Sequence, residues 1–298
     1  MIRWQERDSI NKQGEIMKHF CVITNRPKDP ELKTTSYIKN YLETHGRSCL
    51  VQFTEGTDDH YTDAAEIPDD TDCILVLGGD GTMLQAARDI VEKDIPLLGV
   101  NLGSLGYLTE IEQTGLEQIL PRLLEGEFEI EHRMMVEGRM LRNGKIVDAA
   151  YALNDIVVTR SGSFQIIHYH IWVNGQLLNS YNADGIIIST PTGSTGYNLS
   201  AGGPIVEPGA KLLLMTPICP HTLNTRSIVL SPEDTIEIEI AAGKDGRRQQ
   251  VEANFDGSHP IVLYTGDRME VRRSEKETRI LKLSSVSFLE TLHKKMSG

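Results

Sequence analysis

Five consecutive apolar residues, Cys73-Ile74-Leu75-Val76-Leu77, restrict the fold of this chain more than any other segment. A strand that is apolar at every position is buried on both faces, which is typical of a parallel sheet covered by helices. Strand-like and helix-like segments alternate on either side of this run, from residue 17 to about residue 130. The alternation predicts an N-terminal, Rossmann-like α/β domain in which helices wrap a parallel sheet.

Hydrophobic spacing gives the expected elements of this domain. Strands are expected at residues 20–24, 49–53, 73–77 and 96–100, and helices at residues 32–44, 82–92 and 116–125. The helix at 82–92 has apolar residues at helical spacing, namely Met83, Leu84, Ala86, Ala87, Ile90 and Val91. Residues 1–16 are polar and mixed in charge, so we expect a disordered extension, with Met17 as the biological start.

Beyond residue 130 the pattern changes to short strands. Residues 165–173 run into Asn174-Gly175, a strong signal for a two-residue hairpin. Residues 235–240 alternate between apolar and polar, and are expected to turn back through residues 243–246 into a strand at 249–255. Further strands are expected at 261–264 and 269–272, and a final helix at 287–295. This half is therefore expected to be mostly antiparallel β.

The length of 298 residues exceeds what one compact core usually holds, which favours two domains. The change of pattern near residue 130 is the natural boundary between them. We expect an extension at 1–16, an α/β domain at 17–130, a β-rich domain at 131–275, and a C-terminal segment at 276–298 that packs back on the first domain.

Composition excludes several classes of function. The chain has 30 basic and 42 acidic residues, a net charge of −12, which argues against a general binder of nucleic acid or of anionic membranes. Its four cysteines lack the spacing of a zinc site or a disulfide framework, so a reducing cytoplasm fits best. No apolar run approaches the roughly 18 residues of a membrane span.

The segment Gly78-Gly79-Asp80-Gly81-Thr82 follows the buried strand and opens a helix. Ligands bind at this edge of an open α/β sheet, and glycines followed by a helix N-terminus expose backbone amides that suit a phosphate. No lysine follows at the spacing of a P-loop, so this is not a Walker motif. Asp80 has two interpretations that one residue can satisfy together, a helix N-cap and a functional carboxylate.

Three other segments combine small polar residues with strand ends. Residues 184–204 contain a short β-branched strand followed by a loop of Ser, Thr, Gly and Pro, which lets a polar ligand approach the backbone closely. An ordinary surface loop is the alternative. Residues 101–109 form another glycine-containing loop after a strand. Tyr107 in this loop could stack on a base or belong to the core. Asn154-Asp155 precedes another strand and is by itself a weak signal.

In their order along the chain, these segments and Pro217-Ile218-Cys219-Pro220-His221 resemble the NAD kinases, from about residue 18 to residue 290. The Gly-Gly-Asp-Gly motif alone is less specific, because phosphofructokinases and diacylglycerol-type lipid kinases also carry it. The resemblance implies transfer of a phosphoryl group from ATP, or in some bacterial members polyphosphate, to the 2′-hydroxyl of the adenosine ribose of NAD. It also implies a divalent cation such as Mg²⁺, a C-terminal β-sandwich-like domain, and a homodimer or homotetramer with a site between domains that a neighbouring subunit touches.

The resemblance also implies roles for individual residues. Asp80 would accept the proton of the 2′-hydroxyl, and Gly78, Gly79, Gly81 and Thr82 would bind the donor phosphates. The dinucleotide would be bound by Asp80, Gly81, Tyr107, Asn154, Asp155, Asn182, Asp184, Thr195, Gly196, Tyr197, Asn198, Leu199, Ser200 and Cys219. The metal ion would bridge donor phosphates, and the sequence reveals no dedicated protein ligands for it.

Three positions depart from the family pattern. Many members have Asn-Glu where this chain has Asn154-Asp155, and Thr-Ala-Tyr where it has Thr195-Gly196-Tyr197. Asn182 stands where a basic residue is frequent, so its contact with the ligand is in doubt. Two alternatives remain open. A lipid kinase would need a basic amphipathic surface, and a dinucleotide sensor without catalysis would be expected to have lost Asp80.

Overall fold

The computed structural model describes residues 17–54, 62–103, 106–109, 111–162, 166–221 and 226–297, so the extension expected at 1–16 lies outside the described residues. The chain divides into two compact units, residues 1–132 with 278–298 and residues 133–277. We call them unit 1 and unit 2 and describe each by itself. No helix in the described ranges is long and apolar enough to cross a membrane.

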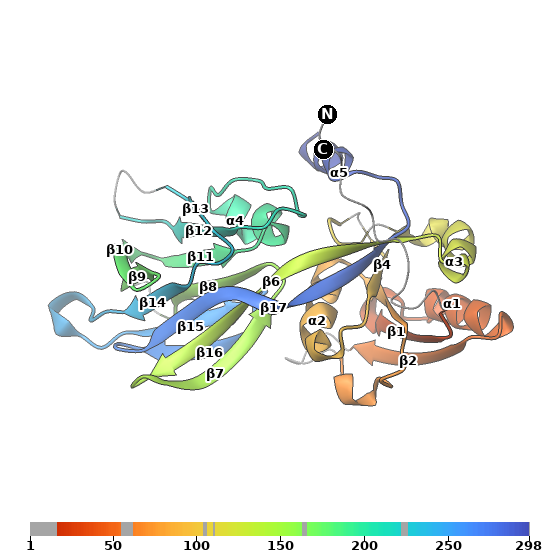
Figure 1. Ribbon diagram of the computed structural model, residues 1–298, viewed down its shortest axis with the longest axis horizontal. Coiled ribbons are helices and arrows are strands. Elements are labelled where there is room, and N and C mark those ends of the chain that lie inside the picture. The colour runs from red at the N-terminus through yellow and green to blue at the C-terminus, as the bar shows by residue number, and fades with distance from the viewer. Residues whose placement is uncertain are drawn as a thin grey trace. The chain divides into compact units, whose positions relative to one another are not determined.

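Unit 1 is built on a parallel sheet (Figure 1). Its strand order is β17-β4-β3-β1-β2, with β5 beside β4, and each neighbouring pair is parallel. The strands are β1 (His19–Asn25), β2 (Ser48–Thr54), β3 (Cys73–Gly78), β4 (Leu97–Asn101), β5 (Ile111–Glu112) and the end of β17 (Arg268–Lys282). Every residue of β3 is buried, as expected for the central apolar run.

Helices cover this sheet. They are α1 (Lys33–Thr44), α2 (Asp80–Asp89) and α3 (Leu116–Glu125), whereas the C-terminal α5 (Phe288–Met296) has no buried residue. Ile38 and Leu42 of α1 join Leu120 and Leu123 of α3 in one core cluster with Leu75 and other strand residues. Ser287 caps α5 and forms a capping box with Glu290, which fixes where that helix begins.

Most elements expected in the first domain are confirmed, but α2 differs at both ends. It begins at Asp80 because Gly79 takes an extended conformation and serves as the N-cap. It ends at Asp89, and a separate 3₁₀ turn, η3 (Val91–Lys93), follows. That turn stops at Asp94, which has a left-handed φ of 51°. The apolar spacing did not reveal this break, because Ile90, which follows the last residue of the helix, is buried like the apolar residues before it.

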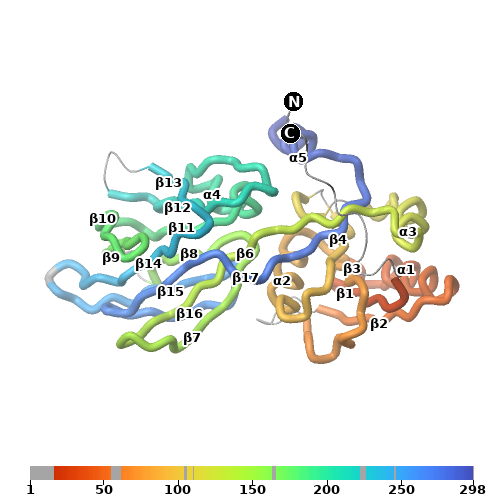
Figure 2. Tube along the Cα trace, viewed as in Figure 1, coloured from red at the N-terminus to blue at the C-terminus, as the bar shows by residue number. Residues whose placement is uncertain are grey.

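Unit 2 is a β-sandwich (Figure 2). One sheet has the order β13-β12-β11-β8-β15-β16 and is antiparallel. Its strands are β8 (Asp155–Arg160), β11 (Gly185–Ser189), β12 (Leu213–Ile218), β13 (Ile228–Leu230), β15 (Gln250–Phe255) and β16 (Ser258–Tyr264). The other layer contains β6 (Glu129–Arg142), β7 (Lys145–Ala152), β9 (Ile167–Val173), β10 (Gln176–Ala183), β14 (Ile236–Ile240) and the first part of β17. Residues of both layers, such as Ile171 and Ile186, share one core cluster.

The hairpin at Asn174-Gly175 is confirmed. Both residues have positive φ, 50° and 76°, as the tight turn between β9 and β10 requires. The hairpin expected between residues 235–240 and 249–255 is wrong. Both edges of β14 are taken by β9 and β17, while β15 pairs with β8 and β16 in the opposite sheet. The turn at 243–247 therefore carries the chain from one layer of the sandwich to the other.

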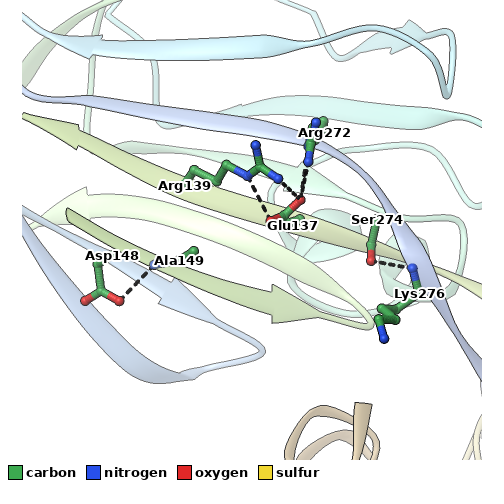
Figure 3. Close-up of polar contacts among 7 residues, drawn as sticks. All are labelled: Glu137, Arg139, Asp148, Ala149, Arg272, Ser274 and Lys276. Atoms are coloured by element: carbon green, nitrogen blue, oxygen red, sulfur yellow. Dashed lines mark hydrogen bonds and ion pairs between the residues drawn. The ribbon is translucent and has the colours of Figure 1, made fainter. Parts of the chain in front are cut away.

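Charged side chains on β6 and β17 pair with one another in unit 2. Glu137 accepts hydrogen bonds from Arg139 (Nε–Oε1 2.8 Å) and Arg272 (Nε–Oε2 3.0 Å), as Figure 3 shows. Burial raises the pKa of Glu137, but the hydrogen bonds from the two guanidinium groups outweigh burial and leave the pKa below its ordinary value. The carboxylate of Glu137 is thus shared by two guanidinium groups, one from β6 and one from β17.

Candidate active site

The N-terminus of α2 presents unoccupied backbone amides at the end of β3. Gly79 is the N-cap, and no side chain in the described residues caps the helix. A Cβ placed on Gly78 would collide with the side chain of Thr82, whereas a Cβ on Gly81 would meet nothing within 4 Å. Gly78 is thus required for packing, and Gly81 faces open space. The amides of this turn are free to bind an anion such as a phosphate.

The carboxylate of Asp80 is held by the segment 106–109. The backbone amide of Tyr107 donates to Oδ2 at 2.7 Å, and the amides of Leu108 and Thr109 donate to Oδ1 at 3.0 and 3.2 Å. The hydroxyl of Thr109 also donates to Oδ1, at 3.2 Å. Asp80 is therefore not the N-cap of α2, because Gly79 has that position and the carboxylate bonds to a different loop. Its orientation is fixed by groups 27 to 29 residues away in sequence.

Gly106 and Tyr107 lie next to this carboxylate. A Cβ on Gly106 would overlap the Asp80 carboxylate, so only glycine lets the loop approach so closely. The ring of Tyr107 is packed against Phe288, with ring centroids 6.2 Å apart, and Lys295 Nζ lies 4.8 Å from its centroid. Burial, and then the charge of Asp80, raise the pKa of the Tyr107 hydroxyl. Ser104 and Leu105 of this loop lie outside the described residues.

In unit 2, the backbone of residues 153–155 is held from two sides. The carboxylate of Asp256 accepts hydrogen bonds from the amides of Leu153 (2.8 Å), Asn154 (2.8 Å) and Asp155 (3.1 Å). Thr190 donates its amide to the carbonyl of Asn154 (2.8 Å) and its hydroxyl to the carbonyl of Leu153 (2.6 Å). These bonds fix the backbone from which the Asn154 side chain projects.

The side chain of Asn154 keeps hydrogen-bonding capacity for a ligand. Its Oδ1 is buried and has no hydrogen-bond partner among the described residues. Its Nδ2 lies 3.5 Å from where a Cβ on Gly196 would stand, so it faces the glycine-rich loop. A buried acceptor without a partner is costly, and a donor group on a ligand would remove that cost.

Asp155 is 5% exposed and lies near the carboxylate of Asp256. Burial, and then the negative charge of Asp256, raise the pKa of Asp155 to about 7. This carboxyl group therefore changes its protonation state near neutral pH. A protonated Asp155 can donate a hydrogen bond, whereas an ionised one only accepts.

The Ser/Thr/Gly loop begins with Thr190 and forms two short turns, η5 (Thr192–Thr195) and α4 (Tyr197–Ser200). Tyr197, Leu199 and Ser200 are exposed, and Thr195 and Gly196 are half-buried, so these five predicted residues are accessible to a ligand. Asn198 is instead 0% exposed. It donates to the carbonyls of Ser194 (3.2 Å) and Pro204 (3.1 Å) and accepts from Thr216 (2.7 Å). Its side chain holds the loop closed from inside.

The remaining predicted residues lie at the opposite end of β11. Asp184 precedes β11 and pairs with Arg160 (Nη1–Oδ1 3.4 Å), while Ser189 ends β11 opposite Asp155. The exposed residues Asn182 and Cys219 lie near Asp184, because the Asp184 amide donates to the Ile218 carbonyl and the His221 amide donates to that of Asn182. Six residue steps of extended strand separate Asp184 from Thr190, about 20 Å. The structure does not bring these two groups of predicted residues together within one unit.

Comparison with known proteins identifies the family. The model of the ATP-NAD kinase N-terminal domain matches residues 22–128, and that of the ATP-NAD kinase C-terminal domain matches residues 153–283. The chain belongs to the NAD kinase family. The NAD kinase of Lachnospira eligens is 43% identical, over 94% of this chain and all of that one. The NAD kinase of Lachnoclostridium phytofermentans is 44% identical, over 94% of this chain and 99% of that one.

Solved structures of NAD kinases share the fold. A structure of an Archaeoglobus fulgidus NAD kinase in complex with ATP has a TM-score of 0.72 at 25% identity, covering 94% of this chain and 99% of that one. A yeast NADH kinase in complex with NADH has a TM-score of 0.79 at 22% identity, covering 99% and 92%. The protein is thus a kinase of this family with the α/β and β-sandwich units that the resemblance implied.

Two residues that shape the site in this member of the family do not stand out in the sequence. Asp256 orients the Asn154-Asp155 pair and has a left-handed φ of 52°. Arg160 pairs with Asp184. Asp256 precedes Gly257 at the tight turn between β15 and β16, so its sequence signal is that of an ordinary turn.

Proposed function

We propose that the protein makes NADP by transferring the terminal phosphoryl group of ATP, or of polyphosphate, to the 2′-hydroxyl of the adenosine ribose of NAD. The observation that carries this proposal is the placement of Asp80. Its carboxylate is fixed by four hydrogen bonds and begins the helix whose free N-terminal amides suit a phosphate. A base and a phosphate cradle next to each other are what phosphoryl transfer to an alcohol needs.

In this proposal Asp80 Oδ2 accepts the proton of the 2′-hydroxyl and is therefore not a ligand of the metal ion. A hydroxyl is a poor nucleophile until a positioned base shares its proton. Oδ1 accepts three hydrogen bonds, whereas Oδ2 accepts one in the described part of the chain, from Tyr107. A carboxylate oxygen has two lone-pair directions, so Oδ2 keeps room for the substrate hydroxyl. The amides of Gly81 and Thr82, with Gly78 and Gly79 as the adjoining backbone, bind the phosphates of the donor.

The dinucleotide is bound in this proposal by Asn154, Asp155 and the exposed face of the Ser/Thr/Gly loop. Support comes from the unpartnered Oδ1 of Asn154 and from the accessibility of residues 195–197. Asn198 then acts by holding the loop rather than by touching the ligand. Tyr107 contacts the base only if the base displaces or joins the packing of Phe288 and Lys295.

A divalent cation fits this site as a companion of the donor phosphates. The described residues contain no group of three or more His, Cys, Asp or Glu that could form a cage for a metal. Mg²⁺ commonly binds through one or two carboxylates and substrate phosphates while keeping several waters. Because Asp80 Oδ2 receives the substrate hydroxyl in this proposal, the cation would be held by the donor phosphates and water. When bound, the cation neutralises charge on the transferred phosphoryl group.

We further propose that the protein acts in the cytoplasm as a homodimer or homotetramer. The distance of about 20 Å along β11 from Asp184 to Thr190 supports a shared site. In that arrangement Asn182, Asp184 and Cys219 of one copy contact the dinucleotide that is bound to Asp80 and Asn154 of another. The four cysteines are unpaired, which suits a reducing compartment.

A coupled assay tests the proposed reaction. Purified protein is incubated with NAD, magnesium and either ATP or polyphosphate, and NADP is detected with an NADP-specific dehydrogenase. We expect NADP with at least one donor. If NAD binds but neither donor yields NADP, the protein is a dinucleotide sensor and the proposed reaction is wrong.

A further inference from the structure

In the sheet of unit 1, the order in which the chain adds strands reverses between β1 and β3. From β1 the chain passes through α1 to β2 on one side, and from β3 it passes through α2 to β4 on the other. Crossovers of the same hand that run in opposite directions place their helices on opposite faces of the sheet. Open α/β sheets bind ligands at such a point, beside the carboxyl ends of the strands, here β1 and β3.

The turn after β1 brings a lysine to the carboxyl end of β3. Lys28 ends the 3₁₀ turn η1 (Arg26–Lys28), which directly follows β1. Its Nζ lies 2.9 Å from the position that a Cβ on Gly79 would occupy. Asn25, the last residue of β1, donates from Nδ2 to the hydroxyl of Thr82 at 3.2 Å, which ties the two loops together. The absence of a side chain at Gly79 leaves the space that the ammonium fills.

The charge of Lys28 is not neutralised by its neighbours. The adjacent acid, Asp29, is buried and faces the start of α1, where it accepts bonds from the amide (2.9 Å) and hydroxyl (2.7 Å) of Thr35. Lys28 is exposed, and its ammonium has no hydrogen bond or ion pair within the ranges that the structure describes. A second donor lies nearby: Asn101, opposite Gly78 in the β3–β4 pair, is 3% exposed and its Nδ2 is without a partner among the same residues.

We propose that Lys28 binds the phosphate chain of the phosphoryl donor above the backbone of Gly79. This inference rests on the proposed function. It supplies the phosphate-binding lysine that the Gly-Gly-Asp-Gly segment lacks. In a P-loop the lysine follows the glycines along the chain and reaches the terminal phosphates. Here the ammonium belongs to Lys28, in the turn after the neighbouring strand β1 and 51 positions before Gly79. It lies beside backbone amides like those of a P-loop. The chemistry it recognises is a chain of phosphates, which a nucleoside triphosphate and inorganic polyphosphate share.

Steady-state kinetics with Lys28→Met and Lys28→Arg test this inference. A hydrogen bond to a charged group contributes roughly one to two powers of ten in affinity, so we expect the KM for ATP to rise about 10- to 100-fold in Lys28→Met. The KM for NAD should stay within about twofold, and Lys28→Arg should recover most of the loss because it keeps the charge. Lys33→Met is the matched control, because Lys33 is an exposed lysine of the same segment whose ammonium pairs with Glu31.

Direct binding separates failure of the inference from failure of the proposed reaction. Calorimetric titration with ATP, and with inorganic tripolyphosphate, needs no turnover. We expect both to bind the wild-type protein about 10- to 100-fold more tightly than Lys28→Met, and parallel assays with ATP and polyphosphate show which source the enzyme uses. If Lys28→Met and Lys33→Met bind tripolyphosphate equally and have equal KM values for ATP, Lys28 does not contact the phosphates. An unchanged melting temperature in Lys28→Met shows that a loss of binding is not a loss of folding.

Discussion

Replacing Asp80 by asparagine should cost both stability and turnover, and the structure separates the two effects. The carboxylate accepts four hydrogen bonds from residues 107–109. An amide oxygen in the place of Oδ1 keeps the three bonds from Leu108 and Thr109. The amide NH₂ then faces the amide of Tyr107, a donor that was 2.7 Å from Oδ2. One charge-assisted bond is lost and two donors oppose each other.

The magnitude of the stability loss follows from that count. A hydrogen bond to a charged group contributes about 1.5–3 kcal/mol, so Asp80→Asn should lower the free energy of unfolding by roughly 2–3 kcal/mol. The melting temperature should fall by about 4–10 °C for units of this size. Loss of a general base should lower kcat by about 100- to 10,000-fold. The activity loss is thus far larger than loop disorder alone would produce at 25 °C, where the variant remains folded.

Thr109→Val is the matched control for Asp80→Asn. It removes only the hydroxyl bond to Oδ1, keeps the carboxylate and nearly preserves the shape of the buried side chain. We expect it to cost about 1 kcal/mol of stability and to leave kcat within a few-fold. The assay is kcat at saturating NAD and ATP, with melting curves and NAD affinity measured on the same samples. If Thr109→Val loses as much turnover as Asp80→Asn, or if Asp80→Asn keeps near wild-type turnover, Asp80 is not the base.

Four other outcomes are expected. Asp256→Asn breaks at least one bond to the backbone of residues 153–155 and should raise the Kd for NAD about tenfold, leaving the KM for ATP unchanged in the kinetic assay. Because the pKa of Asp155 is raised to about 7, the folded state holds a proton that the unfolded chain releases near pH 4, so wild-type stability should fall as pH rises between these values. Urea unfolding of Asp155→Asn should lack this loss, which for the wild type amounts to about 2.7 kcal/mol between pH 5 and pH 8. NAD at about 100 times its Kd should stabilise the protein by about 2.7 kcal/mol, seen as a rise in melting temperature, and no rise would contradict the dinucleotide site. Co-expressed Asp80→Asn and Asp184→Ala should recover roughly a quarter of wild-type activity if the site is shared between two copies, whereas two inactive variants that stay inactive together would contradict sharing.

Local pattern identified most helices and strands of unit 1, but it missed strands of unit 2 such as β6, β7 and β12 and did not give the partners of those it found. The apolar run at β3 was predictable because it is buried on both faces. The turn at Asn174-Gly175 was predictable because these residue types tolerate the two positive φ values that it requires. Residues 235–240 alternate between apolar and polar, which shows that one face is buried. This alternation does not indicate which strand pairs with them. The expected hairpin with β15 failed for that reason, because short sequence separation favours pairing and the sandwich placed the two strands in different layers.

The same limit applies to the site. Glycines and an acid after a buried strand identified the phosphate loop, because its residues are consecutive in the sequence. The groups that orient Asp80 and Asn154 lie 27 and 102 residues from them in sequence, and their residue types are ordinary. Asn198 shows the converse, since a polar residue in a functional loop was expected to face the ligand and instead closes the loop from within.

The two ends of β11 give the strongest reason to look beyond one copy of the chain. A strand paired on both edges is a rigid spacer, and β11 is paired along its whole length with β8 and β12. Side-chain rotation moves a carboxylate by a few ångströms, so it cannot close the gap of about 20 Å from Asp184 to the Asn154 end of the strand. A common ligand for these residues therefore requires either a molecule long enough to run along the sheet or a second copy that presents its Asp184 end. Only the second arrangement allows an intact Asp80 in one copy to work with an intact Asp184 in another.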